Sequence, residues 1–374
     1  MSELKVDEKW MRAAFRLARL GLGKTRPNPA VGAVVVRNGR IIGRGYHKLA
    51  GTDHAEVVAL KDAGHRAKGS TLYVTLEPCS TFGRTPPCTG TILSAGISRV
   101  VISTRDPNPS HNGRGIRLLK RAGLKVIDGV CESEGRALIA PFAKWITTGM
   151  PFVTLKLGTS IDGRISDASG ASRWITSDAS RKIVMQLRGE VDAILVGAAT
   201  AMIDNPSLLP HGTSGSRPMR VIASARGAVP LEAKVFSDGK AAQTIIATTN
   251  RCPVPVAEAI ARTSAQVWCL PSKKGRVSIK ALLKMLGRHG ILHVLCEGGG
   301  AMAGSLIREG LVDEVLFMLA PVVLGGSGAT PAIGGEGWPL NSAPRLNFTE
   351  VRRVGADVLV RARFGEDDNR CSQD

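Results

Sequence analysis

The order of apolar and polar residues along the first 149 residues predicts alternating helices and strands. Residues from about Glu8 to Leu20 place apolar side chains at helical spacing, which indicates an amphipathic helix. Apolar runs bounded by turn residues indicate strands over 31–36, 40–47, 70–76 and 99–104. Helices are expected between the later strands, and Asp53 is placed to cap the one that begins near His54. This alternation is typical of an α/β layer structure.

A second alternating pattern begins after Gly149-Met150-Pro151, which has the composition of a linker. A strand and a turn are expected from Phe152 onward. Further buried strands are predicted over 193–196, 220–223, 244–248, 266–270, 293–296 and 314–319. Helical runs separate several of them, so the second half is expected to be α/β with a mainly parallel sheet. The predicted domains are therefore residues 1–149 and 150–374.

Length and composition agree with an enzyme of two domains. The chain of 374 residues exceeds the size at which single cores usually stop growing, and 43% hydrophobic residues suffice for two cores. No apolar stretch is long enough to span a bilayer, and the N-terminus lacks the features of a signal peptide. The seven cysteines lack the spacing of a disulfide framework. We therefore expect a cytoplasmic protein without a membrane partner.

The net charge of +19 raises the question of a nucleic-acid partner, because phosphate contacts dominate that kind of binding. The basic residues are, however, scattered through both halves, and only 4% of residues are aromatic, which leaves few surfaces for stacking bases. An enzyme that attracts small anionic substrates explains the charge equally well. Charge alone does not decide between these interpretations.

A split motif in the first domain points to metal chemistry: His54-Ala55-Glu56, then Pro78-Cys79, then Cys88. One imidazole and two thiolates can bind zinc and leave its fourth position open. A nearby carboxylate such as Glu56 can then move the protons of a hydrolytic deamination. Three unrelated core residues or a structural zinc site are the alternatives, but a structural site needs a fourth ligand, and none stands at obvious spacing.

Two segments of the second domain are candidates for ligand binding. Glu297-Gly298-Gly299-Gly300 lies between a predicted strand and helix, where glycines let backbone N–H groups approach a phosphate. Asp204-Asn205-Pro206 follows the predicted strand AILVGAAT and is expected at the same edge of the sheet. On its own, the glycine segment is more often an ordinary turn, and the second segment is equally consistent with one. Arg188 and Lys156 could each meet an anion.

Motifs along almost the whole chain resemble one family. They include PNPAVGAVVV, GTDHAE, TLYVTLEPCSTFGRTPPC, VTLKLGTSIDGRI, SRWITS, AILVGAATAMIDNP and CEGGGAMAGSLI. Together they are similar to the bifunctional deaminase/reductases of riboflavin biosynthesis, the RibD family. The eight residues between Cys79 and Cys88, which contain GRTPP, separate this family from deaminases whose two cysteines stand two residues apart.

For the first domain, the resemblance implies a cytidine-deaminase-like α/β/α sandwich. His54, Cys79 and Cys88 would bind Zn²⁺ between the starts of two helices, and Glu56 would transfer protons. The substrate would be 2,5-diamino-6-(5-phosphoribosylamino)pyrimidin-4(3H)-one, a small phosphorylated pyrimidine. Asn28 and His47 match family positions near the substrate pocket and are the candidate substrate-binding residues of this domain.

For the second domain, the resemblance implies a dihydrofolate-reductase-like α/β fold that reduces the ribosyl group of the deaminated product to ribityl with NADPH. Lys156 is a candidate proton donor. Positions matching the cofactor contacts of the family are Gly158, Trp174, Thr200, Asp204, Ser224, Gly299, Gly300, Ala301, Met302, Ala303, Gly304 and Ser305. Those matching its substrate contacts are Ser172, Arg188, Leu208, His211 and Glu297, with Arg188 as the expected partner of the phosphate. A homodimer through this domain is also implied.

Three departures from the family pattern affect the expected pockets. Thr81 stands where the family has a histidine, His211 stands near a usual arginine, and the loop 110–115 has an unusual start. Two other functions therefore stay open. One is a nucleic-acid-modifying zinc deaminase with an accessory domain, which the charge would suit; the other is a relative that has lost one activity and only binds ligand.

Overall fold

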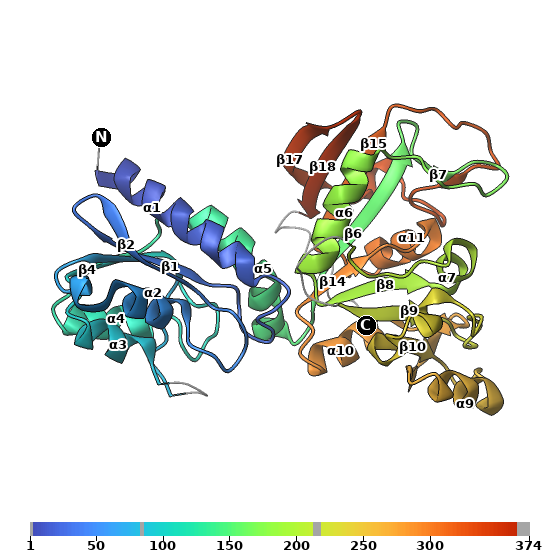
Figure 1. Ribbon diagram of the computed structural model, residues 1–374. Coiled ribbons are helices and arrows are strands. Elements are labelled where there is room, and N and C mark those ends of the chain that lie inside the picture. The colour runs from blue at the N-terminus through green and yellow to red at the C-terminus, as the bar shows by residue number, and fades with distance from the viewer. Residues whose placement is uncertain (1–2, 83–85, 212–217, 365–374) are drawn as a thin grey trace. The chain divides into compact units, whose positions relative to one another are not determined.

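The computed structural model describes residues 3–82, 86–211 and 218–364 (Figure 1). Its chain divides into two units, Met1–Gly149 and Met150–Asp374. No helix within the described residues is long and apolar enough to cross a membrane.

The first unit is built on a five-stranded sheet in the order β2-β1-β3-β4-β5. The strands are β1 (Gly32–Arg37), β2 (Arg40–Tyr46), β3 (Thr71–Leu76), β4 (Arg99–Thr104) and β5 (Lys125–Ile127). β1 runs antiparallel to both of its neighbours, whereas β3, β4 and β5 are parallel. The carboxyl ends of β3 and β4 therefore lie at one edge of the sheet, which is where ligands collect in such sheets.

Helices cover both faces of this sheet. They are α1 (Glu3–Ala18), α2 (Ala55–Ala63), α3 (Cys88–Ser94), α4 (Arg114–Arg121) and α5 (Glu132–Thr148). One face packs against α1, whose Met11, Ala14 and Phe15 are buried at helical spacing, and against α5 (Figure 1). The other face packs against α2, α3 and α4. The predicted α/β/α sandwich is confirmed.

The start of α2 is placed by close packing on β2. A Cβ atom at Gly45 would lie 2.2 Å from the backbone oxygen of Ala55, so only glycine lets the helix approach this closely. The prediction that Asp53 caps α2 is wrong. His54 occupies the N-cap position and caps no backbone N–H with its side chain, while Asp53 forms an exposed ion pair with Lys61 at 2.6 Å. Asp53 lies one residue too early to reach the free N–H groups of the first turn.

The second unit contains a nine-stranded sheet in the order β11-β10-β9-β8-β14-β6-β15-β18-β17. Its strands are β6 (Phe152–Ser160), β8 (Ala193–Gly197), β9 (Met219–Ala223), β10 (Thr244–Thr248), β11 (Gln266–Cys269), β14 (His293–Cys296), β15 (Glu314–Ala320), β17 (Leu346–Val354) and β18 (Asp357–Phe364). The first seven strands in this order, β11 through β15, are parallel to one another, as predicted.

The antiparallel hairpin of β17 and β18 was not predicted. β17 is an edge strand whose side chains are mostly exposed, so its sequence LNFTEVRRV contains no apolar run. A second difference concerns the segment AILVGAAT, which was expected to be one strand. β8 ends at Gly197, and the helix α7 (Ala198–Asp204) begins directly after it.

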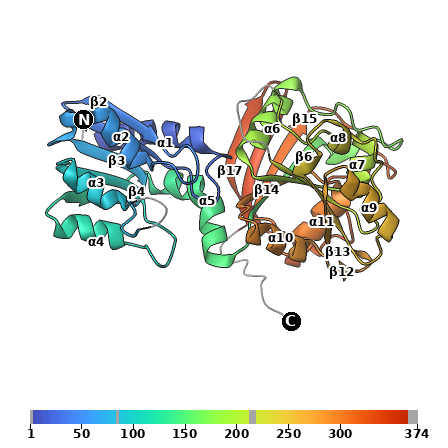
Figure 2. The same ribbon diagram turned by 60° about the horizontal axis from the view of Figure 1, so that its bottom comes forward.

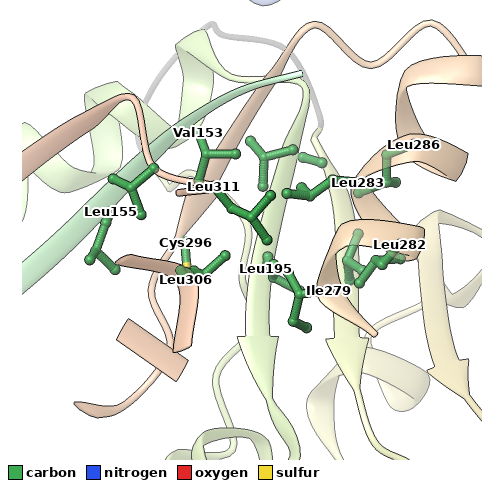
Figure 3. Packing of buried hydrophobic residues seen from close by; sticks show 14 of the residues in the cluster. Val153, Leu155, Leu195, Ile279, Leu282, Leu283, Leu286, Cys296, Leu306 and Leu311 are labelled. Carbon is green, nitrogen blue, oxygen red and sulfur yellow. The ribbon is translucent and has the colours of Figure 1, made fainter. Parts of the chain in front are cut away.

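Two apolar layers hold the helices of the second unit onto its sheet. The helices are α6 (Asp178–Glu190), α7, α8 (Lys234–Ser237), α9 (Val254–Arg262), α10 (Ile279–Arg288) and α11 (Gly300–Arg308). On one face, Leu282, Leu283 and Leu286 of α10 and Leu306 of α11 pack on strand residues such as Leu195 (Figure 3). The other face packs against α6, α7, α8 and α9. Two antiparallel pairs of short strands lie outside the main sheet. β12 (Ser272–Lys273) and β13 (Arg276–Val277) form a hairpin (Figure 2), whereas β7 (Arg164–Ser166) pairs with the distant β16 (Thr330–Pro331).

Candidate active sites

The structure brings His54, Cys79 and Cys88 together in the first unit. His54 precedes α2, Cys79 follows β3, and Cys88 begins α3, so each residue stands at the end of an element. The Nδ1 atom of His54 lies 3.2 Å from Sγ of Cys88 and 3.5 Å from Sγ of Cys79. All three ligand atoms lie within 4.8 Å of one another.

These residues fit a zinc ion. Tetrahedral zinc with its usual bonds to nitrogen and sulfur separates the two ligand atoms by about 3.6 Å, close to the distances found here. Hydrogen bonds from Cys88 and His54 lower the pKa of the Cys79 thiol to about 4, which favours the thiolate that binds metal. Three protein ligands leave one tetrahedral position for a non-protein ligand, as catalytic zinc sites do.

Glu56 lies on the first turn of α2, beside this cluster. Its side chain is 3% exposed, and it interacts with the Cys88 thiol. Burial and the negative charge of Cys79 raise the pKa of Glu56 to about 7. A carboxyl group with such a pKa can both accept and release a proton near neutral pH, which is what general acid–base catalysis requires.

Asn28 and His47, predicted from the family motifs, lie beside the cluster as a hydrogen-bonded pair. The side-chain amide of Asn28 donates to Nε2 of His47 at 3.0 Å, while Nδ1 of His47 lies 3.2 Å from the carbonyl oxygen of Asp53. The rings of His47 and His54 meet edge to face, with their centroids 5.2 Å apart. The amide oxygen of Asn28 thus stays available to a ligand.

The surroundings of Thr81 contain a histidine that the sequence analysis did not find. Oγ1 of Thr81 lies 3.3 Å from Nδ1 of His111, which belongs to the loop between β4 and α4. Glu77 fixes this loop, because its buried carboxylate accepts backbone N–H groups of Asp106, Gly113 and Ile116 at 3.2, 2.9 and 3.2 Å. The departures at Thr81 and in loop 110–115 therefore meet in space. Residues 83–85 of the GRTPP segment lie outside the described residues.

A cavity of about 1850 Å³ lies at the carboxyl ends of the parallel strands in the second unit. Sixteen of the predicted reductase-site residues and the candidate Lys156 line it: Gly158, Ser172, Trp174, Arg188, Thr200, Asp204, Leu208, His211, Ser224, Glu297, Gly299, Gly300, Ala301, Met302, Gly304 and Ser305. Ala303 does not line it. The Ala303 side chain is fully buried in the core between α11 and the sheet, so its predicted contact with the cofactor stays a prediction.

The glycines of the segment 298–304 have different roles. A Cβ atom at Gly300 would lie 2.2 Å from the carbonyl oxygen of Pro331, and one at Gly304 would lie 1.9 Å from that of Gly334. Both glycines therefore allow loop 330–336 to pack against α11. At Gly299 the nearest atom would be Oγ1 of Thr200, at 3.7 Å. Gly299 caps α11, whose first N–H groups have no partner within the helix. This open helix start fits the phosphates of a dinucleotide.

Lys156, Arg188 and Glu297 form a charged group deep in the cavity. Arg188 donates from Nε and Nη2 to the two oxygens of Glu297, at 2.7 and 3.0 Å. Arg188 was expected to bind a phosphate, but two of its nitrogens are thus engaged and Nη1 lies 3.4 Å from the carbonyl of Leu209. Burial lowers the pKa of Lys156, although the charge of Glu297 acts in the opposite direction. A Cβ atom at Gly158 would lie 3.6 Å from Nζ of Lys156, so the amine faces the same space.

The Ser172–Trp174 segment and α7 also line the cavity. Oγ of Ser172 donates to Asp204 at 3.3 Å, and the Arg173 guanidinium hydrogen-bonds the Asp204 carbonyl. The Trp174 ring is 69% exposed, with the guanidinium of Arg181 4.5 Å from its centroid. His211, at the cavity edge, is 2.9 Å from the hydroxyl of Ser207.

The first unit thus carries the ligand set and buried carboxyl group of a zinc deaminase, and the second carries a dinucleotide-type cavity. A family model of the cytidine and deoxycytidylate deaminase zinc-binding region matches residues 4–104, and one of the RibD C-terminal domain matches residues 151–360. Together they define a deaminase joined to a reductase.

Curated relatives and solved structures agree. The riboflavin biosynthesis protein RibD of Bacillus amyloliquefaciens is 42% identical over 361 residues, 96% of each chain. That of Escherichia coli (strain K12) is 40% identical over 370 residues, 95% of this chain and 98% of the relative. Form 1 of Acinetobacter baumannii RibD is 36% identical, has a TM-score of 0.86 and covers 97% of this chain and 100% of its own.

A Thermotoga maritima structure described as a diaminohydroxyphosphoribosylaminopyrimidine deaminase/5-amino-6-(5-phosphoribosylamino)uracil reductase is 33% identical, with a TM-score of 0.84 and coverage of 97% and 100%. The chain belongs to the RibD family, the bifunctional deaminase/reductases of riboflavin biosynthesis. Its cofactors are zinc in the deaminase domain and NADPH in the reductase domain.

Proposed function

We propose that residues 1–149 deaminate 2,5-diamino-6-(5-phosphoribosylamino)pyrimidin-4(3H)-one to 5-amino-6-(5-phosphoribosylamino)uracil, and that residues 150–374 reduce the ribosyl group of this product to ribityl. The observation that carries the proposal is the convergence of His54, Cys79 and Cys88 beside the buried carboxyl group of Glu56. The Arg188–Glu297 pair with Lys156, deep in the second cavity, supports the reductase half.

In the deaminase half, His54, Cys79 and Cys88 would hold the zinc, which when bound makes a water molecule nucleophilic near neutral pH. Glu56 takes a proton from the attacking water and delivers it to the amine of the pyrimidine, which leaves as ammonia. Its pKa of about 7 suits both transfers. The Asn28 amide, oriented by His47, hydrogen-bonds the pyrimidine.

In the reductase half, the start of α11 at Gly299 and the walls at Gly158 and Trp174 would hold NADPH, which supplies a hydride when bound. Glu297 and Arg188 orient the hydroxyl groups of the ribosyl chain, because their paired charges keep both side chains in fixed positions. The protonated ammonium group of Lys156 donates the proton that the ring oxygen of the sugar needs when the ring opens, and becomes a neutral amine. Its lowered pKa favours this release.

The test is a coupled assay with Glu56→Gln, which keeps the shape of the side chain and removes its acid–base chemistry. We expect deamination to fall by about 10²- to 10⁴-fold. Zinc content per chain and NADPH oxidation with the deaminated pyrimidine should stay at wild-type levels. The matched control is Glu132→Gln, which removes a carboxylate paired with Arg136 on the surface.

Wild-type deamination by Glu56→Gln would refute the role of Glu56. Failure of the unmodified protein to deaminate the free pyrimidine, together with salt-sensitive binding of tRNA, would favour a nucleic-acid deaminase instead. Failure of the unmodified protein to oxidise NADPH with the deaminated pyrimidine would refute the reductase half.

A homodimer through the second unit also belongs to the proposal. The edge strand β17 exposes the apolar side chains of Phe348 and Val351, by 74% and 59%. Such a strand can pair with a second copy. Sedimentation of the full chain should give a dimer, and Phe348→Glu should shift it to the monomer; a wild-type monomer at every concentration would contradict this.

A further inference from the structure

One wall of the cavity in the second unit is strongly basic. Lys273, Lys274 and Arg276 come from the β12–β13 pair, and Lys280 from the first turn of α10. Arg308 of α11 lies on the same cavity. Figure 2 shows β12 and β13 beside α11. Three of these residues belong to the run KKGR at 273–276.

Most of this positive charge is left without a carboxylate. Lys273 pairs with Glu309 at 3.1 Å, and Arg308 lies over the ring of Trp338, 4.7 Å from its centroid. Within residues 3–82, 86–211 and 218–364, neither Lys274, Arg276 nor Lys280 has an ion-pair partner. Three positive charges therefore face the cavity unpaired, which favours a ligand with more than one negative charge.

The backbone that carries these cations is held in place. Arg251 donates from Nη1 to the carbonyl of Gly275 at 3.1 Å, which fixes the turn between β12 and β13. The hydroxyl of Ser278 accepts the N–H of Ala281 at 3.3 Å and caps α10. The Lys273–Glu309 pair ties the turn to the end of α11. The basic wall is thus a positioned surface and not a frayed tail.

The basic wall belongs to a different part of the cavity from the reacting groups. Lys156 lies on β6 and Glu297 follows β14, which are neighbouring strands. The β12–β13 pair follows β11, the edge strand on the other side of β8, β9 and β10. The helix start at Gly299 comes directly after Glu297, and Ser224 follows β9, which lies between β14 and β11 in the sheet. The cavity therefore extends from the reacting groups and the adjoining phosphate-type site at Gly299, past Ser224, to a second cationic site.

Resting on the proposed reductase function, we propose that Lys274, Arg276 and Lys280 bind the 2′-phosphate of NADPH and so select this cofactor over NADH. The 2′-phosphate is the only difference between the two cofactors, and it carries up to two negative charges. In the dinucleotide, two ribosyl groups and a pyrophosphate separate it from the nicotinamide, which matches the separation of the basic wall from Lys156. The 5-phosphate of the pyrimidine substrate is only a few bonds from the reacting carbon, so it must bind nearer Lys156.

The test compares NADPH with NADH as cofactors for Lys280→Ala, for the triple variant Lys274→Ala/Arg276→Ala/Lys280→Ala, and for the wild type. The control is Lys284→Ala, which removes the same charge one helical turn away on the exposed side of α10, outside the cavity. The probes 2′,5′-ADP and ADP, added as competitive inhibitors, report the 2′-phosphate separately from the pyrophosphate.

We expect the triple variant to lose about tenfold in affinity for NADPH and for 2′,5′-ADP, since each exposed cation contributes a few-fold. Affinity for NADH and ADP should change less than about twofold, and Lys284→Ala should match the wild type. High salt should reduce the wild-type preference for NADPH more than that of the triple variant.

Equal weakening of NADPH and NADH would overturn the proposal in favour of a pyrophosphate site. A raised KM for the pyrimidine alone would assign the wall to the substrate phosphate, and unchanged kinetics would remove any role in binding. A wild-type protein that oxidises neither cofactor would instead refute the reductase function, so the two failures are distinguishable.

Discussion

From the close contact between α11 and loop 330–336, we predict that Gly304→Ala destabilises the second unit. In an isolated helix this change is favourable by about 1 kcal/mol, because alanine has the higher helix propensity. Here the new Cβ atom would lie 1.9 Å from the carbonyl oxygen of Gly334, a backbone atom that cannot rotate away. Overpacking of this kind costs about 1–3 kcal/mol, and this severe overlap belongs at the upper end. We expect a net loss of about 2 kcal/mol.

For a unit of this size, that loss lowers the melting temperature by about 4–8 °C. Differential scanning calorimetry should show it in the transition of the second unit and leave that of the first unchanged. The control is Gly299→Ala, where the nearest atom would be 3.7 Å away. Gly299→Ala should keep the wild-type melting temperature but weaken NADPH binding, because the methyl group enters the space at the helix start. An unchanged or raised melting temperature for Gly304→Ala would refute the packing argument.

Two further predictions concern buried carboxylates. Glu77→Ala should destabilise the first unit by about 2–4 kcal/mol in urea unfolding and raise the KM for deamination, because three backbone N–H groups lose their acceptor and the loop carrying His111 is released. Glu77→Gln should recover part of the stability and part of the KM. Equal KM values for the wild type and both variants would contradict this role of the loop. Burial raises the pKa of Glu297, but Arg188 and Lys156 outweigh it and hold this pKa below 4.5. The stabilisation from Glu297 is therefore fully present above pH 4.5 and is lost as the pH falls through the lowered pKa. The free energy of unfolding of the wild type should exceed that of Glu297→Gln by less and less below about pH 4.5. A constant difference down to about pH 3 would count against the Arg188–Glu297 ion pair.

The residues of the metal site could be predicted from their spacing in the sequence. His54, Cys79 and Cys88 stand at the ends of elements that apolar patterning locates well, so their convergence follows from the order of strands and helices. The role of His111 does not follow in the same way. His111 lies 30 residues from Thr81, and it meets Thr81 from the loop between β4 and α4, which Glu77 holds by hydrogen bonds. Such loop contacts leave no periodic signal in the chain.

The second unit extends the same argument to glycine and charge. The run at 298–304 has the composition of a phosphate-binding turn, yet Gly300 and Gly304 are needed for a loop 30 residues further on, and Gly299 is the position left open to a ligand. Likewise, the scattered lysines and arginines suit small anionic substrates but do not show where the β12–β13 cations would gather, because a basic stripe is recognised in sequence only when its members share one element. Here the basic residues that line the cavity come from β12, β13, α10 and α11, so they lie together only in the folded protein. Part of the high net charge therefore lies along a cavity that can take a small anionic ligand.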